Sequence, residues 1–281
     1  MRTMIDIIPA EGEDEPWSPT SIVFALTAAT FAQIDSTSLV CDLAAGGAVS
    51  SIAIARRTHA HIHAVDSSSV AIASIVSRCQ QYHVSEFVSP IQMDAVEYLD
   101  HALEEGLKFD LVLAEGGIGG VVGHQLLLNK IRGMLKPAGV LIMSGFAYNG
   151  VTEQPALTNR ITTPAPEDVR EHYENTMYSA TRRDIPDEQQ LLKLIEACGF
   201  NLCINFRSGQ NHWSAYFERM QRMAVQGVDV ACQHHSAARR FGIGEAYHNL
   251  RGQFYLCYAV LIAQSRTTVE PQTKQLASEN S

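Results

Sequence analysis

The chain has 281 residues, of which 46% are hydrophobic and 18% are charged, and its formal net charge is -9. This amount of apolar material is enough for one large domain that carries a cap. The acidic balance and the scattered basic pairs argue against a nucleic-acid partner, because phosphate binding is driven by clustered Lys and Arg. No run of 18 apolar residues occurs, so we expect no membrane span and a cytoplasmic location.

Residues 1–35 predict an N-terminal cap segment. An acidic stretch is followed by Ser18 and Pro19, which suit the N-cap and first position of a helix over residues 18–31. Apolar residues then recur at helical spacing within this range. We expect the segment to help cover a ligand crevice.

From residue 36 onward the chain alternates between short apolar runs and helical segments. The runs predict strands at residues 38–44, 61–68, 87–95, 109–117 and 139–146, and the segments between them predict helices at 50–58, 68–83 and 123–139. This alternation is typical of an α/β fold in which a parallel sheet has helices on both faces.

The remaining sequence predicts the rest of one domain over residues 36–264. The polar, proline-bearing residues 150–185 predict a substrate-side insertion or lid. Further elements are expected as a helix at 187–200, a strand at 201–209, a helix at 212–227, and a long apolar strand at 252–264 that closes the sheet. The polar residues 265–281 predict a disordered tail.

Six cysteines are present, and no two of them form a C-x-x-C pair. Several stand inside apolar runs. They are interpreted as small buried hydrophobic side chains in a reducing compartment.

The segment LVCDLAAGGAVSSIAIA, residues 39–55, carries the strongest chemical signal. A hydrophobic strand ends near Asp42, passes through a turn of small residues, and enters a helix. Small side chains let a ligand approach the turn, and the first turn of the helix presents unpaired N–H groups to it.

Two more acids follow predicted strands, Asp66 after the second and Asp94 after the third. An acid at the end of the second strand is placed to hold a ribose diol, and Asp94 lies where an adenine edge would sit. The three acids therefore converge on the carboxyl edge of the sheet. The simpler role for each is that of a helix cap.

The sequence DLAAGGA, residues 42–48, resembles the first motif of class I S-adenosylmethionine-dependent methyltransferases, commonly D/E-x-G-x-G-x-G. It does not supply the G-x-G-x-x-G of a dinucleotide site. The segments FDLVLAEGG and KPAGVL extend the resemblance roughly from Trp17 to Gln264. AEGGIGGVVGHQ and HWSAYFERMQ are similar to a UbiE-like subgroup of bacterial small-molecule enzymes.

The resemblance implies a Rossmann-like, seven-stranded, mostly parallel sheet and methyl transfer from S-adenosyl-L-methionine to a small-molecule acceptor. It places the amino-acid end of the cofactor at the first turn, the ribose at the second strand, the adenine at the third and the methyl group at the fourth. The implied cofactor-binding residues are Asp42, Ala44, Gly46, Asp66, Ser67, Asp94, Ala95, Glu115 and Gly116.

The chemistry needs alignment and exclusion of water, because the sulfonium is already activated. A base is also useful when the acceptor is a hydroxyl or an amine. The candidates are Glu115, His124, Tyr148 and His212. The aromatic residues Trp213, Tyr216 and Phe217 could stack an aromatic substrate, but their helical spacing favours packing in the core.

Two positions depart from the family motif, since Ala44 and Ala48 stand where it has glycine. One methyl group is accommodated there as long as the backbone is not left-handed. The glycines Gly119 and Gly120 replace an aromatic-Asn pair of the subgroup, which alters the floor of the substrate site.

Other functions remain open from the sequence. His59, His61 and His63 alternate with period two, but the first two precede or only begin the predicted strand and no fourth ligand follows, so we expect no metal site. The fold also hosts reactions other than methylation, and a non-catalytic S-adenosylmethionine-binding protein or an RNA methyltransferase is a further alternative. The expected partner is a small molecule, with a homodimer left open.

Overall fold

The computed structural model of the chain describes residues 22–116, 125–148, 187–208, 212–216, 218 and 256–266. Within these residues one sheet has the strand order β3-β2-β1-β4-β5-β7-β6. The strands are β1 (Leu39–Leu43), β2 (His61–Asp66), β3 (Val88–Gln92), β4 (Phe109–Ala114), β5 (Leu135–Tyr148), β6 (Phe200–Arg207) and β7 (Leu256–Ser265). The helices are α1 (Ile22–Phe31), α2 (Val49–Thr58), α3 (Ser69–Gln81), α4 (Ala95–Glu104), α5 (Gln125–Met134) and α7 (Glu188–Ala197).

The first five strands are parallel, with β1 at the centre between β2 and β4. β7 runs antiparallel to both β5 and β6. The predicted α/β fold, a seven-stranded and mostly parallel sheet of the Rossmann-like type, is therefore confirmed. Its carboxyl edge collects the ends of β1, β2, β3 and β4, which is where open sheets of this kind bind ligands.

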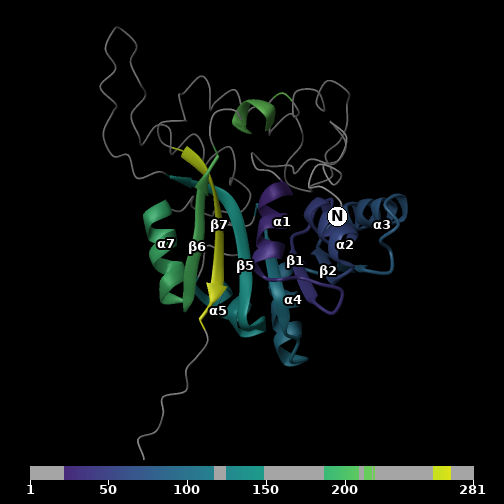
Figure 1. Cartoon of the computed structure of the whole chain (residues 1–281), viewed down its shortest axis with the longest axis horizontal. Coiled ribbons are helices and arrows are strands. Elements are labelled where there is room, and N and C mark those ends of the chain that lie inside the picture. The colour runs from purple at the N-terminus through teal and green to yellow at the C-terminus, as the bar shows by residue number, and fades with distance from the viewer. Residues whose placement is uncertain are drawn as a thin grey trace, which may run out of the picture.

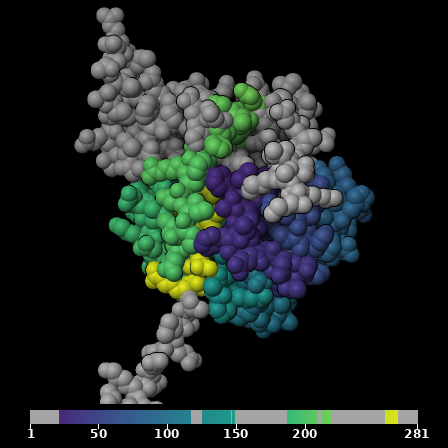
Figure 2. All heavy atoms as spheres, viewed as in Figure 1, coloured from purple at the N-terminus to yellow at the C-terminus, as the bar shows by residue number. Residues whose placement is uncertain are grey.

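Two hydrophobic cores lie on opposite faces of the sheet. On one face α1, α2 and α3 bury residues such as Leu26 and Ile54 against Val40 of β1. On the other face α4, α5 and α7 bury residues such as Leu99 and Ile131. Figure 1 shows α7 and β6 at one end of this arrangement and α3 at the other. In Figure 2 the surface of α1 and α2 lies between the surface of α3 and that of residues 187–208.

The long apolar strand does not close the sheet as predicted. β7 lies between β5 and β6, and β6 is the edge strand. Residues 258–263 of β7 are buried without interruption, whereas residues along β6 alternate between buried or half-buried and exposed. A strand that is apolar on both faces is favoured inside a sheet, and an alternating one is favoured at its edge.

Several predicted boundaries also change. α5 ends at Met134 and β5 begins at Leu135, so residues 136–139 belong to the strand instead of the helix. The sequence predicts a tail that begins at Ser265, but Ser265 ends β7 and pairs with Phe200. Residues 18–21, the predicted lid at 150–185, residues 219–227 and residues 267–281 lie outside the described part of the chain, so the predictions for them stay open.

The cysteine prediction is confirmed at Cys41, Cys79 and Cys198, whose side chains are buried as free thiols, and is wrong at Cys203, which is exposed on the edge strand. Cys232 and the side chain of Cys257 lie outside the described part. Among the described residues, no helix has the length and apolar character needed to cross a membrane.

Candidate functional site

In the turn between β1 and α2, every second residue has a left-handed backbone conformation. Ala44, Gly46 and Ala48 all have positive φ, at 58°, 55° and 49°. These are the three positions where the family motif has glycine, and two of them carry a methyl group in the conformation that disfavours it. The condition for tolerating these alanines is therefore not met, and each costs about 1–2 kcal/mol of backbone strain.

Two hydrogen bonds to the main chain of the turn tie it to β2 and α3. The Ala45 amide donates to the Val65 carbonyl at 2.9 Å, which ties the turn to β2. Arg78 of α3 donates from Nη1 to the Gly47 carbonyl at 3.1 Å. A Cβ atom at Gly47 would lie 3.0 Å from that Nη1, whereas one at Gly46 would meet no atom of the described residues within 4 Å. The turn is therefore fixed from one side and open above Gly46.

Asp66, at the end of β2, is joined to the same turn. Its carboxylate accepts a hydrogen bond from the Gly46 amide at 2.9 Å and another from the Ser68 amide, also at 2.9 Å. Asp66 is half-buried, and Ser67 beside it is exposed. The predicted ribose acid is thus at the predicted edge, next to the predicted glycine.

Two further carboxyl groups lie at the start of α2. The Ser51 hydroxyl donates to Asp42 Oδ2 at 2.6 Å, and the neighbouring Ser50 hydroxyl donates to Glu115 Oε2. Asp42 is only 4% exposed. The other oxygen of Glu115, Oε1, is buried and has no hydrogen-bond partner among the described residues. Glu115 follows directly after β4, so the helix terminus brings together acids from two adjacent strands.

The electrostatics of this group favour a cation. Burial raises the pKa of Asp42 to about 8, opposed by the Ser51 hydrogen bond and reinforced by the nearby Glu115 and Asp66 carboxylates. Burial also raises the pKa of Glu115, with the Ser50 hydroxyl acting in the opposite direction. A positive ligand group between these acids would favour their charged forms.

Asp94 is exposed and acts as the N-cap of α4, where its Oδ1 accepts from the Val96 amide at 2.8 Å. The adjacent Met93 amide donates to the Asp66 carbonyl at 3.1 Å, which draws the ends of β2 and β3 together. The capping role is therefore established for Asp94. It leaves the second carboxylate oxygen and half-buried Ala95 beside the predicted adenine position.

The segment after β4 is held by a buried polar pair that the sequence did not predict. The Gly116 amide donates to Ser144 Oγ at 3.0 Å, and Ser144 Oγ lies 3.1 Å from the Tyr258 hydroxyl. Ser144 belongs to β5 and Tyr258 to β7, and both are at most 1% exposed. Gly116 itself has φ of 77°.

The other candidate bases are not gathered with these acids by any contact in the described structure. Tyr148 is 5% exposed and packs in the core. It lies five residues along β5 from Met143, the residue that pairs with Ala114 at the end of β4. His212 is half-buried, and its ring lies 5.6 Å from that of Phe206 on the edge strand. His124 lies outside the described residues. Trp213 and Tyr216 are buried in the core, as packing predicts.

The histidine triplet is divided between two elements. His59 is the left-handed C-cap of α2, whereas His61 and His63 are in β2, so His59 lies outside the strand as predicted and His61 is its first residue. His63 Nδ1 lies 2.6 Å from the Tyr98 hydroxyl. In the described parts of the chain, no group of three or more His, Cys, Asp or Glu side chains could hold a metal ion.

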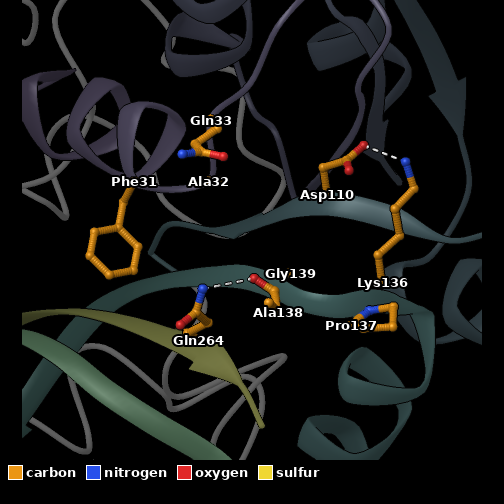
Figure 3. Close-up of a pocket in the computed structure, with 9 residues that line it drawn as sticks. All are labelled: Phe31, Ala32, Gln33, Asp110, Lys136, Pro137, Ala138, Gly139 and Gln264. Atoms are coloured by element: carbon orange, nitrogen blue, oxygen red, sulfur yellow. Dashed lines mark hydrogen bonds and ion pairs between the residues drawn. The ribbon is translucent and has the colours of Figure 1, made fainter. Parts of the chain in front are cut away.

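A separate hollow of about 370 Å³ lies at the opposite edge of the sheet, near the starts of β4 and β5. Figure 3 shows its polar lining, in which Lys136 reaches Asp110 at 2.8 Å and Gln264 reaches the Ala138 carbonyl at 3.0 Å. The charged groups of the lining are thus paired with each other, and Gln264 is bonded to the main chain. The hollow is distant from the acids at the strand ends and takes no part in their site.

A family model described as "Methyltransferase domain" matches residues 34–222. This match covers more than half of the chain. The chain belongs to the methyltransferase-domain family. The family confirms the predicted class I methyltransferase that depends on S-adenosylmethionine, while the UbiE-like subgroup stays a prediction. A search of curated proteins finds no match to this methyltransferase.

Solved structures share the fold of the methyltransferase at low sequence identity. A methyltransferase from Geobacter sulfurreducens with S-adenosyl-L-homocysteine is 19% identical, with TM-score 0.63, over 89% of this chain and 94% of that one. One from Thiobacillus denitrificans, with the same ligand, is 17% identical, with TM-score 0.63, over 95% and 99%. The [4+2]-cyclase SpnF is 16% identical, with TM-score 0.61, over 92% and 85%.

The sequence of this methyltransferase predicts the acids at the carboxyl edge of the sheet but not the groups that hold them. Ser50 and Ser51 follow the predicted turn directly, and serines in the first helical turn after an acid are a usable signal. Ser144 is a lone hydroxyl in an apolar strand, which marks a buried polar contact. No local pattern singles out Tyr258 among the aromatic residues of its strand.

Proposed function

We propose that this methyltransferase transfers a methyl group from S-adenosylmethionine to a small-molecule acceptor, through the acids at the carboxyl edge of its sheet. The observation that carries the proposal is the convergence of Asp42, Asp66 and Glu115 on one turn. No cation among the described residues forms an ion pair with any of the three. The buried Glu115 Oε1 atom without a partner also fits a donor or a positive charge supplied by a ligand.

The cofactor matches this arrangement in charge and shape. S-adenosylmethionine carries a sulfonium and an ammonium, and buried acids are stabilised in their ionised form by such groups. The open space above Gly46 leaves the turn accessible to a ligand. The fit supports Asp42, Ala44 and Gly46 as contacts for the amino-acid end of the cofactor.

The remaining contacts follow the order of the strands. Asp66 and Ser67 stand where the ribose would be held, and Asp94 and Ala95 stand at the next strand, on the adenine side. Glu115 and Gly116 come after β4 and would line the place of methyl transfer. This order supports the cofactor-binding residues expected from the sequence.

The cofactor supplies an electrophilic methyl group, and the chain supplies alignment and electrostatics. The acids fix the positive end, and the Gly116 segment sets the wall beside the acceptor. Among the described candidates for a base, Glu115 fits best, since it follows β4 directly and its raised pKa favours proton uptake. Tyr148, His212 and His124 remain candidates with less support.

A small-molecule acceptor is supported by the charge of the chain. The net charge is -9, and three acids line the proposed site. Such a field repels the phosphate backbone of a nucleic acid. The charge of the chain therefore favours methylation of a metabolite over methylation of RNA.

A labelling assay tests the proposal. The full chain is incubated with S-adenosylmethionine labelled in its methyl group and with a cell extract divided into small-molecule, RNA and protein fractions. We expect label in the small-molecule fraction, together with S-adenosylhomocysteine in equal amount. Label confined to RNA or protein would overturn the acceptor class.

The same assay separates the alternative functions. Conversion of an acceptor without S-adenosylhomocysteine would indicate another reaction on this fold, and SpnF, a cyclase of similar fold, is the observation that keeps this alternative in view. Binding of S-adenosylmethionine with no product in any fraction would indicate a non-catalytic protein. In this assay the Glu115→Gln variant is the control for the role of the carboxylate, because it retains the shape of the side chain and removes its charge.

A further inference from the structure

A chain of hydrogen bonds crosses the carboxyl edge of the sheet from β7 to the start of α2. The Tyr258 hydroxyl lies 3.1 Å from Ser144 Oγ, which accepts the Gly116 amide at 3.0 Å. The residue before Gly116 is Glu115, whose carboxylate accepts from Ser50 at the start of α2. Side chains and main chain from β7, β5, β4 and α2 are thus joined through one short segment.

The strand register explains why this contact forms. Ala114, the last residue of β4, pairs with Met143, so Ser144 on β5 stands beside the segment that leaves β4. On the other side of β5, Phe146 pairs with Tyr258, which places the tyrosine ring two residues further along the edge. A hydroxyl group at each position is needed to join the three strands.

The Gly116 segment needs such an anchor. Its left-handed φ of 77° suits glycine. Because glycine has no side chain, the backbone at this position is less restricted than elsewhere. Among the described residues, a Cβ at this position would meet only the Tyr258 hydroxyl, at 3.9 Å. The buried hydrogen bond to Ser144, whose hydroxyl is in turn bonded to that of Tyr258, therefore replaces the packing that a side chain would provide.

We propose that Ser144 and Tyr258 are positioning residues, which hold the Glu115–Gly116 segment in the orientation that receives the positive end of the cofactor. The inference rests on the proposed function and deepens it, because it adds two residues from β5 and β7 to a site otherwise built from the first four strands. Neither residue touches the cofactor in this account. They act through the Gly116 amide on the carboxylate next to it.

The test compares Tyr258→Phe and Ser144→Ala with a matched control, Tyr98→Phe. Tyr98 is also a buried tyrosine, 2% exposed, and its hydroxyl is 2.6 Å from His63 Nδ1, but no hydrogen bond joins it to Gly116. Two quantities are measured on each full-length variant: the Kd for S-adenosylmethionine by calorimetry, and the hydrogen-exchange rate of the Gly116 amide. Thermal unfolding shows which variants are folded.

We expect Tyr258→Phe and Ser144→Ala to weaken cofactor binding about three- to tenfold, which corresponds to the loss of one buried hydrogen bond. Exchange at Gly116 should accelerate in both variants. Tyr98→Phe should change neither quantity, although it loses a hydroxyl of the same kind. If Ser144→Ala does not fold, Tyr258→Phe alone carries the test.

Wild-type affinity and unchanged Gly116 exchange in folded Tyr258→Phe would overturn the inference. Equal weakening in Tyr98→Phe would also overturn it, since the effect would then be general to the core. If the wild-type protein binds no S-adenosylmethionine, the proposed function fails instead. The exchange rate at Gly116 still decides in that case whether the two hydroxyl groups anchor the segment.

Discussion

The carboxylate of Asp66 accepts a hydrogen bond of 2.9 Å from the main-chain amide of Gly46. The second strand is thereby linked to the turn after the first, and the residue expected to bind a ribose also shapes the loop expected to bind the amino-acid end. The Ser68 amide donates to its other oxygen at 2.9 Å. Changes at Asp66 therefore act on the shape of the site as well as on a ligand contact.

Asp66→Ala should lose both cofactor affinity and stability. Removing the carboxylate leaves two main-chain donors without their partner, which costs about 1–3 kcal/mol when such groups are buried and less where water reaches them. Urea denaturation measures this loss, and calorimetry with S-adenosylhomocysteine measures the affinity. A variant with unchanged stability would show that the two hydrogen bonds do not hold the turn.

Asp94→Ala should weaken cofactor binding beyond the effect of removing a helix cap. Asp187 provides the matched control, because it caps α7 in the same way, with its Oδ1 accepting from the Gln189 amide at 2.8 Å. Each substitution should cost about 1 kcal/mol of stability. Only Asp94→Ala should raise the Kd for S-adenosylmethionine; an equal Kd in the two variants would leave Asp94 as a cap alone.

Ala44→Gly should stabilise the protein. Ala44 is exposed and has φ of 58°, so glycine relieves strain without removing a buried methyl group. The relief of about 1–2 kcal/mol, less about 0.4–1 kcal/mol for the freer unfolded chain, leaves a net gain of roughly 0.5–1 kcal/mol. The midpoint of urea denaturation should rise accordingly.

Ala48→Gly is the comparison for that result. Ala48 also has a positive φ, 49°, but it is fully buried. Loss of its methyl group costs about 0.8 kcal/mol, which nearly cancels the net gain of roughly 0.5–1 kcal/mol that glycine would otherwise give. A fall in stability at Ala44→Gly, or an equal gain in both variants, would contradict this explanation of the two alanines.

The stability of the cofactor-free protein should fall as pH rises from about 4 to about 8. Burial raises the pKa of Asp42 from its usual 3.8 to about 8, so the folded state binds a proton in this range that the unfolded state has released. The contribution is therefore complete below the unfolded value and is lost as pH passes through the folded value. The raised pKa of Glu115 acts in the same direction.

Asp42→Asn should remove most of this pH dependence. Thermal unfolding midpoints between pH 4 and pH 8 measure it for the wild type and for the variant. A slope that is identical in both would show that Asp42 is already ionised in the folded protein at neutral pH.

Cofactor binding near pH 7 should release protons into the buffer. A cationic ligand favours the ionised form of Asp42 and lowers its pKa, so part of the bound proton must leave. Calorimetric enthalpies in buffers of different ionisation enthalpy report the number released. Asp42→Asn should reduce it, and no release in the wild type would contradict the contact between Asp42 and the positive end.

Much of the fold could be predicted because it follows from local patterns of apolar and polar residues. The alternation of apolar runs with helical segments predicts the parallel part of the sheet, and the small-residue turn after Asp42 predicts the edge at which Asp42, Asp66 and Glu115 lie. Strand-end acids such as Asp66 and Glu115 can also be recognised locally, because each comes at the end of an apolar run. Their direction is set by strand periodicity and topology.

What could not be predicted depends on contacts between distant elements. The place of β7 between β5 and β6 is set by burial on both faces of the sheet, which a single strand pattern does not reveal. The partners of Asp42 and Glu115 depend on how α2 packs on the sheet. The left-handed backbone at Ala44 and Ala48 could be stated only as a condition, because residue type alone does not fix φ.

The most direct test is calorimetric titration of the full-length protein with S-adenosylmethionine, repeated with Glu115→Gln. The account predicts micromolar binding to the wild type and binding at least about tenfold weaker to the variant, as expected for loss of a charge-assisted contact. A folded wild-type protein that takes up no S-adenosylmethionine, or a Glu115→Gln variant that binds as tightly as the wild type, would contradict the claim that these acids hold the cofactor.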